Sequence, residues 1–525
     1  MKKYFLFIIA FLVNFTATAQ IAGTLNSAFS QDGYDDTFFG GNPGLAFPVT
    51  ETIIQPDGKI LICVGANVFG EPQQAVITRY NPNGTVDLNF GGGDGTVRSK
   101  EDLAIDLYID AIGMTIQNNG KIVIAGNNFG TPVIFRLNAD GSFDTTFATN
   151  GAFQIMGGDL EVILDVFVQS DNKIIVCGEE SIFVNGVIVG NILLWRFTEN
   201  GILDTTFGNA GEVSYNNSNW LNGDEIYLRF NDLIVFPDDK IIINLSYNAG
   251  SSSFVMLRKL NSNGALDTSF GTNGAFIKSE SITAGEFTVS SSSIRSNGSI
   301  VTTWTTLNST NSTYTQSLFR ITNQGVLDTS FNVNLDNPTN FPEIIQIVAS
   351  GDKIYVFKKA TTNPLTFDEI HCLDLNGNPV TAFGTNGIAI INQNNIPESR
   401  PGKAAIASNG NIYIASNLTA SNGDEMFFIS NINGFDPNLS TNDLLAENNT
   451  TVFPNPSTGI FTIKSESNIE NTVISIYDLN GRELFSVKSE KLNNQILELS
   501  SLQNGIYILN ILDGNNKFSK KLVKR

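Results

Sequence analysis

The chain has 525 residues, of which 51 are acidic and 31 are basic, and its formal net charge at neutral pH is −20. This length exceeds that of one ordinary domain, and a hydrophobic content of 41% is sufficient for a large core. Because nucleic acids and anionic membranes bind basic surfaces, the acidic balance argues against both as partners. We expect a monomer whose surface charge keeps it dispersed.

The first 19 residues have the features of a secretory signal peptide. Lys2 and Lys3 precede an apolar run at residues 4–13, and the small residues at 17–19 predict cleavage between Ala19 and Gln20. The apolar run is too short to span a bilayer, and no other segment approaches the ~20 apolar residues of a transmembrane helix. The sequence therefore predicts an exported protein without a transmembrane segment.

Two phrases recur along residues 20–437, and together they indicate a repeat architecture. The first phrase is a turn glycine followed, two residues later, by Leu-Asp-Thr-Ser/Thr-Phe or a variant of it. Its final residues are spaced by 61, 57, 60, 63, 61 and 52 positions, at Phe29, Phe90, Phe147, Phe207, Phe270, Phe331 and Phe383. The second phrase is a polar turn, often Asp-Gly-Lys, that leads into a β-branched run, with its copies at 55–59, 117–121, 169–173 and 236–240, and weaker copies at 295–299, 349–353 and 407–411.

The repeated unit predicts four short strands joined by glycine-containing turns, with almost no helical periodicity. Four strands in each of seven units indicate an all-β fold, namely a seven-bladed β-propeller over residues 20–437. The last unit has Ser440 where the closing phenylalanine belongs, whereas residues 23–29 supply a spare copy of the phrase. We therefore expect the N-terminal copy to pair into the last blade and to close the ring.

The closing phrase carries an aspartate that a hairpin would place opposite a basic residue. The segment 81–84, Asn-Pro-Asn-Gly, fits a type I turn with a glycine bulge, in which the residue five before the glycine faces the residue three after it. The predicted pairs are Arg79–Asp87, Arg136–Asp144, Arg196–Asp204, Lys259–Asp267 and Arg320–Asp328. Where the acid is lost, at Val380 and Pro437, the base is lost too, at Cys372 and Ile429. We interpret these residues as structural cross-strand ion pairs rather than as a binding site.

The composition changes after residue 437. Residues 438–450 are polar and rich in asparagine, which is typical of a linker. Residues 451–525 alternate between strand patterns and turns, which predicts a small antiparallel β-sandwich. Its motifs are Phe-Pro-Asn-Pro at 453–456, Tyr-Asp-Leu-Asn-Gly-Arg at 477–482, Asn-Gly-Ile-Tyr at 504–507 and Lys-Lys-Leu-Val-Lys-Arg at 520–525.

These motifs resemble two known families. The Asp-Gly-Lys turn and the Gly-x-Leu-Asp-Thr-x-Phe strand resemble the delta-60 β-propeller repeats of exported bacterial proteins, most specifically in the first five units. The four C-terminal motifs, in order, resemble the type A C-terminal sorting domain of the type IX secretion system. The second resemblance implies that the secretion machinery is a partner and that the chain crosses the outer membrane of a Gram-negative bacterium. It also implies removal of the domain, followed by release or surface attachment. The first resemblance implies a fold, not an activity.

No motif in the chain predicts a cofactor or a nucleophile. The single histidine, His371, has no second histidine with which to hold a metal, and we interpret Cys63 and Cys177 as small buried side chains on equivalent strands. The repeated Asp-x-Asn/Asp-Gly strings offer too few oxygens for the roughly six to eight ligands of calcium, so turn chemistry explains them better. We expect no cofactor, with calcium at one or two blade edges kept as an alternative.

Two functions remain open. The first is a non-catalytic propeller, displayed at or released from the cell surface, that binds a glycan or a protein. The second is a secreted polysaccharide-degrading enzyme with acids at the mouth of the central channel, and the acidic candidates are Asp159, Glu161, Glu179, Glu180, Asp224 and Glu225. The structural use of the repeated residues favours the first function, whereas acids that converge on one face with raised pKa values would favour the second.

Overall fold

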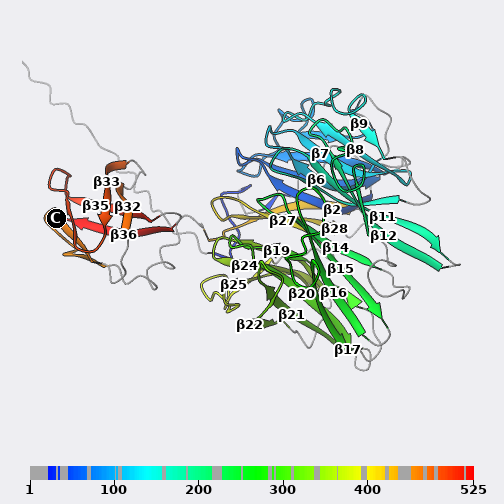
Figure 1. Ribbon diagram of the computed structural model, residues 1–525. Coiled ribbons are helices and arrows are strands. Elements are labelled where there is room, and N and C mark those ends of the chain that lie inside the picture. Colours follow the sequence, from blue (N-terminus) through cyan, green and yellow to red (C-terminus); the bar gives the residue numbers. More distant parts are fainter. Residues whose placement is uncertain are drawn as a thin grey trace, which may run out of the picture. The chain divides into compact units, whose positions relative to one another are not determined.

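The computed structural model of the protein describes residues 22–30, 34–35, 45–67, 73–100, 102–103, 109–155, 161–184, 187–215, 228–249, 252–281, 287–288, 291–308, 313–335, 343–362, 365–391, 399–419, 425–435, 451–464, 470–477, 483–513 and 516–525. The chain divides into two compact units, Met1–Gly434 and Phe435–Arg525. The described residues form strands and no helix, so the predicted all-β class is confirmed (Figure 1). The predicted signal peptide, its cleavage site at Ala19 and Gln20, and the predicted linker 438–450 lie outside the described residues.

The described strands of the first unit form seven antiparallel sheets, which we number as blades 1 to 7 in chain order. The strands of blade 1 are β2 (Leu45–Ile54), β3 (Ile60–Asn67), β4 (Gln73–Tyr80) and β5 (Thr96–Arg98). Those of blade 2 are β6 (Ile109–Ile116), β7 (Ile122–Asn128), β8 (Thr131–Leu137) and β9 (Ala152–Gln154). Those of blade 3 are β10 (Glu161–Val168), β11 (Ile174–Val184), β12 (Val187–Phe197) and β13 (Glu212–Tyr215). Those of blade 4 are β14 (Arg229–Val235), β15 (Ile241–Ala249), β16 (Ser252–Leu260) and β17 (Ala275–Ser281).

The remaining three blades follow the same plan with local departures. Blade 5 contains β18 (Phe287–Thr288), β19 (Ser292–Ile294), β20 (Ile300–Asn308), β21 (Thr313–Ile321) and β22 (Leu327–Asn334). Blade 6 contains β23 (Glu343–Ser350), β24 (Lys353–Thr362), β25 (Leu365–Asp374) and β26 (Ile388–Ile391). Blade 7 contains β27 (Ser399–Ile406), β28 (Ile412–Thr419), β29 (Glu425–Ile432) and, as its outermost strand, β1 (Tyr34–Asp35).

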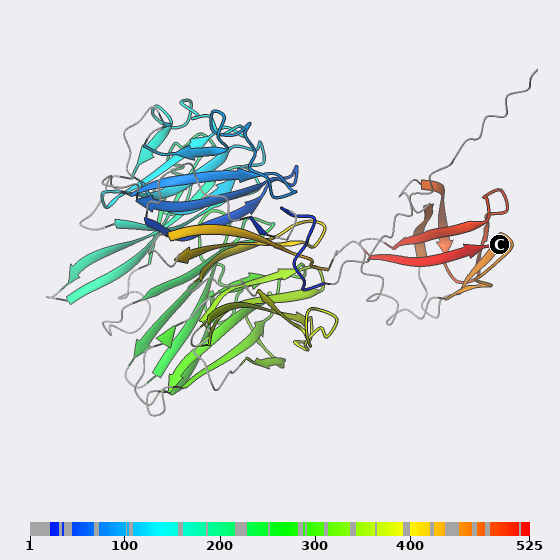
Figure 2. The same ribbon diagram turned by 180° about the vertical axis from the view of Figure 1, so that it is seen from behind.

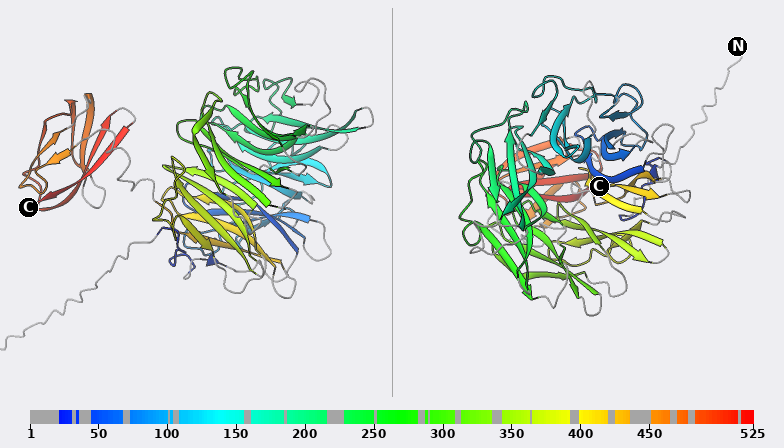
Figure 3. Two further views of the ribbon diagram at one scale, coloured as in Figure 1. Left: turned by 90° about the horizontal axis from the view of Figure 1, so that it is seen from below. Right: turned by 90° about the vertical axis from the view of Figure 1, so that its right-hand side faces the viewer.

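The seven sheets stand around a closed ring. The inner strands β2, β6, β10, β14, β19, β23 and β27 contact one another in that order, and β27 contacts β2 in turn. Figure 2 shows β2 in blue beside β27 in gold, and the right-hand view of Figure 3 shows the strands arranged around the ring. The hydrophobic core lies between neighbouring sheets: one cluster joins Leu61 and Ile77 of blade 1 to Ile109 and Phe135 of blade 2. This packing explains why the second strand of each unit is apolar on both faces.

The N-terminal copy of the repeat completes blade 7, as predicted. The backbone N–H of Gly23 donates to Asn433 O at 2.6 Å, and that of Asn26 donates to Asn431 O at 2.8 Å. Leu25 is bridged to Ile432, and β1 then pairs with β29. Phe29 is fully buried in a cluster that joins blade 1 to blade 7. The first described residues of the chain therefore supply the outer strand of the last blade.

The second unit is a two-sheet sandwich. One sheet contains β30 (Thr451–Phe453), β31 (Ile460–Lys464) and β34 (Gln495–Glu498). The other contains β33 (Glu483–Lys491), β32 (Glu470–Tyr477), β35 (Gly505–Asp513) and β36 (Asn516–Lys524). Phe461, Ile474 and Leu509, all fully buried, belong to the core that the two sheets share.

Candidate functional site

Four of the five predicted ion pairs are formed, and in blades 1 to 3 the polar turn of the repeat adds a lysine to them. The distances from the arginine nitrogen to the aspartate Oδ2 are 2.8 Å for Arg79–Asp87, 2.7 Å for Arg136–Asp144, 2.9 Å for Arg196–Asp204 and 2.6 Å for Arg320–Asp328. The turn lysine Nζ lies near the same oxygen at 2.9 Å in Lys59–Asp87, 2.6 Å in Lys121–Asp144 and 3.5 Å in Lys173–Asp204. The two repeated phrases are therefore held together by one carboxylate in each of these blades.

The fifth predicted pair, Lys259–Asp267, is wrong. Asp267 pairs with the turn lysine Lys240 at 2.9 Å, whereas the Lys259 ammonium lies 4.5 Å from the ring centre of Phe236 and 3.5 Å from the carbonyl oxygen of Asn323. The donors of an ammonium group all radiate from one nitrogen, whereas the planar fork of arginine reaches the aspartate and the neighbouring blade from separate nitrogens. The general pattern of one base opposite one acid is right, but the partner in blade 4 is a different lysine.

The arginines also link each blade to the next, which the sequence did not reveal. Arg79 Nη1 donates to Ala139 O at 2.5 Å, Arg320 Nη1 donates to Leu375 O at 2.6 Å, and Arg136 Nη1 donates to Glu199 O. These three guanidinium groups and that of Arg196 lie 4.5 to 4.7 Å from the ring centres of the closing phenylalanines of their units, Phe90, Phe147, Phe207 and Phe331. The closing phenylalanine, the arginine and the aspartate thus form one buried structural unit, consistent with a role in stability.

Backbone hydrogen bonds also join neighbouring blades. In every copy except that of blade 5, the residue after the closing phenylalanine donates its N–H to the turn of the next unit, as in Gly208 to Asn263 O at 2.9 Å and Gly271 to Gln324 O at 2.7 Å. The N-terminal copy takes its place in the series, because Gly384 donates to Ala22 O and Ser30 donates to Asn83 O, both at 2.8 Å. The N-terminal copy of the phrase therefore links blade 6 to blade 1 in the same way.

A second group of charges lines the centre of the ring, and sequence reasoning missed it. Glu51, Asp165, Asp232 and Lys403 come from the inner strands β2, β10, β14 and β27. The Lys403 ammonium lies 3.0 Å from Glu51 Oε2 and 3.9 Å from Asp165 Oδ2. We call these four residues the channel cluster. Each occupies the same place in its unit, four residues before the first residue of the polar turn, and this shared position is the signal that could have found them.

The pKa values of the four residues in the channel cluster are all shifted from their usual values. Burial raises the pKa of Glu51 and of Asp165, although the nearby Lys403 charge opposes the rise. Burial also raises the pKa of Asp232 to about 6, against hydrogen bonds from the Ser292 N–H at 2.7 Å and the Ser291 hydroxyl at 3.1 Å. The Lys403 side chain is 39% exposed. Burial alone would lower its pKa, but the three acids raise it well above the usual value.

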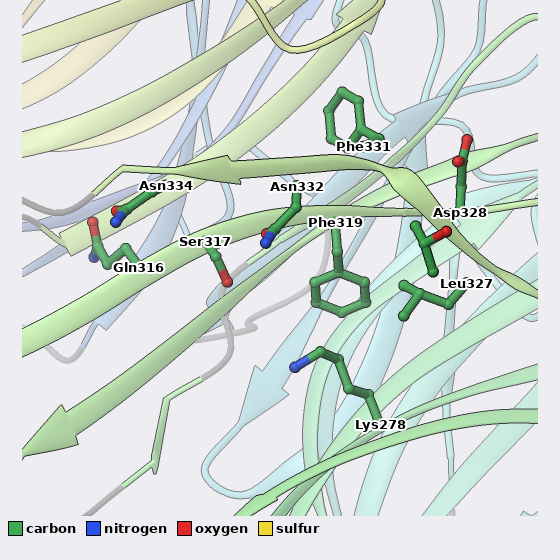
Figure 4. A pocket seen from close by; sticks show the side chains of 10 residues that line it. Lys278, Gln316, Ser317, Phe319, Leu327, Asp328, Phe331, Asn332 and Asn334 are labelled. Atoms are coloured by element: carbon green, nitrogen blue, oxygen red, sulfur yellow. The ribbon is translucent and has the colours of Figure 1, made fainter.

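A pocket of about 420 Å³ opens where blades 4 and 5 meet, and Figure 4 shows its walls. Ser317 and Phe319 of β21 pair across the sheet with Asn334 and Asn332 of β22. Lys278, from β17 of blade 4, faces them, and its ammonium lies 4.0 Å from the Trp304 ring centre and 5.7 Å from that of Phe319. In Figure 4 the Lys278 ammonium, the Ser317 hydroxyl and the Asn332 amide point toward a common space.

The other residues singled out from the sequence show ordinary environments or lie outside the described segments. Asp159, Asp224 and Glu225 are outside the described residues, and Glu180 is opposite Glu161 and accepts from Asn191 Nδ2 at 3.3 Å. His371 Nε2 lies 3.0 Å from Glu369 Oε2. Cys63, Cys177 and Cys372 are buried free thiols, and burial raises the pKa of Cys63 to about 12. Among the described residues, no three or more His, Cys, Asp or Glu side chains are placed to hold a metal ion.

Comparison with known proteins identifies both parts of the chain. A family model described as a secretion system C-terminal sorting domain matches residues 451–525. A second model, a β-propeller domain of unknown function (DUF5122), matches residues 55–90, 117–147, 169–207 and 237–270, which are the first four units. An endo-acting ulvan lyase of Formosa agariphila is 31% identical over 116 residues, a match that spans 22% of this chain and 22% of the lyase.

Similar solved structures are distant in sequence. PorZ, a surface component of the type IX secretion system of Porphyromonas gingivalis, has 12% identity and a TM-score of 0.39, over 91% of this chain and 59% of PorZ. An ulvan lyase of polysaccharide lyase family 25 has 10% identity and a TM-score of 0.44, over 75% of this chain and 95% of the lyase. The β-propeller domain of the trilobed protease from Pyrococcus furiosus has 10% identity and a TM-score of 0.37, over 75% of this chain and 98% of that domain.

The sorting domain supports export through the type IX secretion system. In the part of the chain that the structure describes, no helix is long and apolar enough to cross a membrane. The chain thus combines DUF5122 β-propeller repeats with a secretion system C-terminal sorting domain.

Proposed function

We propose that the protein is a non-catalytic propeller, carried out of the cell by the type IX secretion system, that binds a glycan or a protein at the cell surface or after release. The observation that carries this proposal is the sorting domain at residues 451–525, in the same chain as a propeller. The repeated ionisable residues support the non-catalytic part, because their charges are used in bonds that hold the blades together.

A second candidate function is cleavage of a polysaccharide, and the channel cluster favours it. Glu51, Asp165 and Asp232 are acids from different blades with raised pKa values, the property expected of a general acid. The relative of Formosa agariphila is named an ulvan lyase, although the match covers only 22% of it. Against this function, the Lys403 charge at 3.0 Å stabilises the ionised form of Glu51, so less of this carboxyl holds a proton to donate.

Export and catalysis can be tested separately. For export, the native host expresses the full chain and a chain without residues 443–525. We expect the full chain in the medium or on the cell surface, and the shortened chain in the periplasm. If the shortened chain reaches the surface at the normal level, the role of the sorting domain is wrong.

For catalysis, the purified protein is incubated with acidic and neutral polysaccharides, including ulvan, and the products are sized. We expect binding without a change in chain length. Cleavage by the wild type that is abolished in both Asp232→Asn and Glu51→Gln would replace the binding proposal with the enzymatic one.

A further inference from the structure

We propose that the pocket between blades 4 and 5 binds an acidic sugar unit, with the carboxylate or sulfate of the sugar at Lys278. This inference rests on the proposed binding function and names its ligand class and its site. The argument starts from two departures from the repeat that meet in this one pocket.

The first departure is Lys278 itself. It is the fourth residue after the glycine that ends the outer turn of its blade, and the equivalent residues are Ser99, Ile155, Tyr215 and Ile391. These four are uncharged and buried, and Ile155 and Tyr215 belong to the hydrophobic clusters that join their blade to the next one. Lysine at this position places a cation where the repeat otherwise has a neutral, mostly apolar side chain. Its ammonium lies 4.0 Å from the ring centre of Trp304 in blade 5, so this lysine also bridges the two blades that form the pocket.

The second departure is a missing turn in blade 5. In blades 1 to 4 and 6, a glycine-ended turn follows the closing phenylalanine and covers an apolar residue of the phrase. An added Cβ at Gly211 would lie 2.7 Å from Leu203, and one at Gly274 would lie 2.6 Å from Leu266. In blade 5 the chain instead runs from Phe331 straight along β22 to Asn334.

The missing turn leaves an open wall of mixed character. The residue that such a turn would cover, Leu327, lines the pocket together with Asp328 and Phe319. The side chain of Asp328 is 25% exposed, whereas Asp87 and Asp144 in blades with the turn are 3% and 4% exposed. Blade 5 also has the shortest spacing between closing phenylalanines, 52 residues from Phe331 to Phe383.

The chemistry of the lining selects an anionic sugar. The hydroxyl of Ser317 and the side-chain amides of Asn332 and Asn334 can donate to and accept from sugar hydroxyls. Asp328 is held by Arg320 and by the Ser330 hydroxyl, at 2.6 Å each, and Lys278 supplies a positive charge to the lining. On a protein of net charge −20, a cation set among amides and an apolar wall favours an anionic group. A volume of about 420 Å³ suits a small ligand rather than a folded protein.

The test measures binding by the purified full chain, using calorimetry with three oligosaccharides of matched length. One carries carboxylates (oligogalacturonate), one carries sulfates (a carrageenan oligosaccharide) and one is neutral (a maltooligosaccharide). The variants are Lys278→Gln, which removes the charge, Lys278→Arg, which keeps it, and Asn332→Ala, which removes one amide. The control is Lys100→Gln, which removes a charge from the corresponding segment of blade 1.

We expect at least one acidic oligosaccharide to bind and the neutral one not to bind. Lys278→Gln should weaken binding at least about tenfold, as expected for loss of a charge-assisted hydrogen bond. Lys278→Arg should restore most of the affinity, and Lys100→Gln should leave it unchanged. Added salt should weaken wild-type binding more than binding by Lys278→Gln. The response to the carboxylated and the sulfated probe identifies which anion the pocket prefers.

Three outcomes would overturn the inference: neither acidic probe binds, the neutral probe binds equally well, or Lys278→Gln binds like the wild type. None of these affects the proposed function, which fails instead if the protein cleaves the chains or if export does not depend on residues 443–525. Thermal unfolding of each variant, followed by fluorescence, separates a loss of binding from a loss of fold.

Discussion

The arginine that bridges two blades should be among the most stabilising single residues in the propeller, and Arg136→Met tests this. Arg136 is 1% exposed, and its guanidinium bonds Asp144, Gln117 Oε1 at 3.0 Å and the carbonyl of Glu199 in blade 3. Breaking a buried pair by removing one partner costs about 3–5 kcal/mol. Lys121 stays 2.6 Å from Asp144, so we expect the lower end, about 3 kcal/mol.

The matched comparison is Arg320→Met in blade 5. There the side chains of Arg320 and Asp328 are 13% and 25% exposed, so water replaces part of the lost bond and we expect about 1 kcal/mol. The assay is urea unfolding followed by tryptophan fluorescence, because all three tryptophans lie in the propeller and none in the C-terminal unit. A cost for Arg136→Met no larger than that for Arg320→Met would refute the argument from burial.

The pH dependence of stability provides a second test of Arg136→Met. Burial alone would raise the pKa of Asp144, but hydrogen bonds from Lys121 and Thr146 and the charge of Arg136 hold it well below its usual value. A lowered native pKa adds stability above the unfolded pKa, about 3.9 for aspartate, and this stability is lost as the pH falls toward the native value. The stability difference between wild type and Arg136→Met should therefore shrink as the pH falls below about 4.

Three further changes test other parts of the structure. Asp232 has a raised native pKa of about 6, so its contribution to the stability of the fold is favourable below the unfolded pKa of about 3.9 and is lost as the pH rises through about 6. The melting temperature of the wild type should therefore fall over this pH range, and Asp232→Asn should make the fall smaller. An unchanged pH profile of the melting temperature would contradict this. Gly141→Ala should lower the free energy of unfolding more than Gly120→Ala does. Both glycines have positive φ, but only at Gly141 would an added Cβ lie 2.8 Å from Phe90. Equal losses of stability in urea unfolding would show that φ alone matters. Deleting residues 22–30 should lower the melting temperature, a synthetic peptide of those residues should restore it, and a deletion without effect would mean that the ring does not depend on this strand.

The blades and their ion pairs could be predicted from the sequence because each rests on local spacing. The distance between Arg79 and Asp87 follows from one hairpin, and the same hairpin recurs along the chain. Lys259 was misassigned because the choice between it and Lys240 depends on reach to the next blade, which no hairpin rule contains.

The channel cluster and the pocket needed the structure for a different reason. Asp165 and Lys403 are far apart in the chain and meet only because the ring brings their strands to one axis. The pocket depends on an absent turn and on Lys278 in the preceding blade, so no single unit contains it. Its one sequence signal, the short spacing after Phe331, shows that residues are missing but not what their absence uncovers.

The pairing of residues 23–26 with residues 431–433 also fixes the order in which the chain can reach its final state. The segment that leaves the ribosome early has to wait for its partner until nearly the whole propeller has been synthesised, a contact of very high sequence separation. A chain that ends anywhere before β29 lacks the strand with which its N-terminal segment pairs, so blade 7 stays incomplete. Its unpaired strand edges are then exposed to aggregation and to proteases. The sorting domain begins at residue 451, shortly after β29, so a chain long enough to carry that domain is also long enough to close its ring.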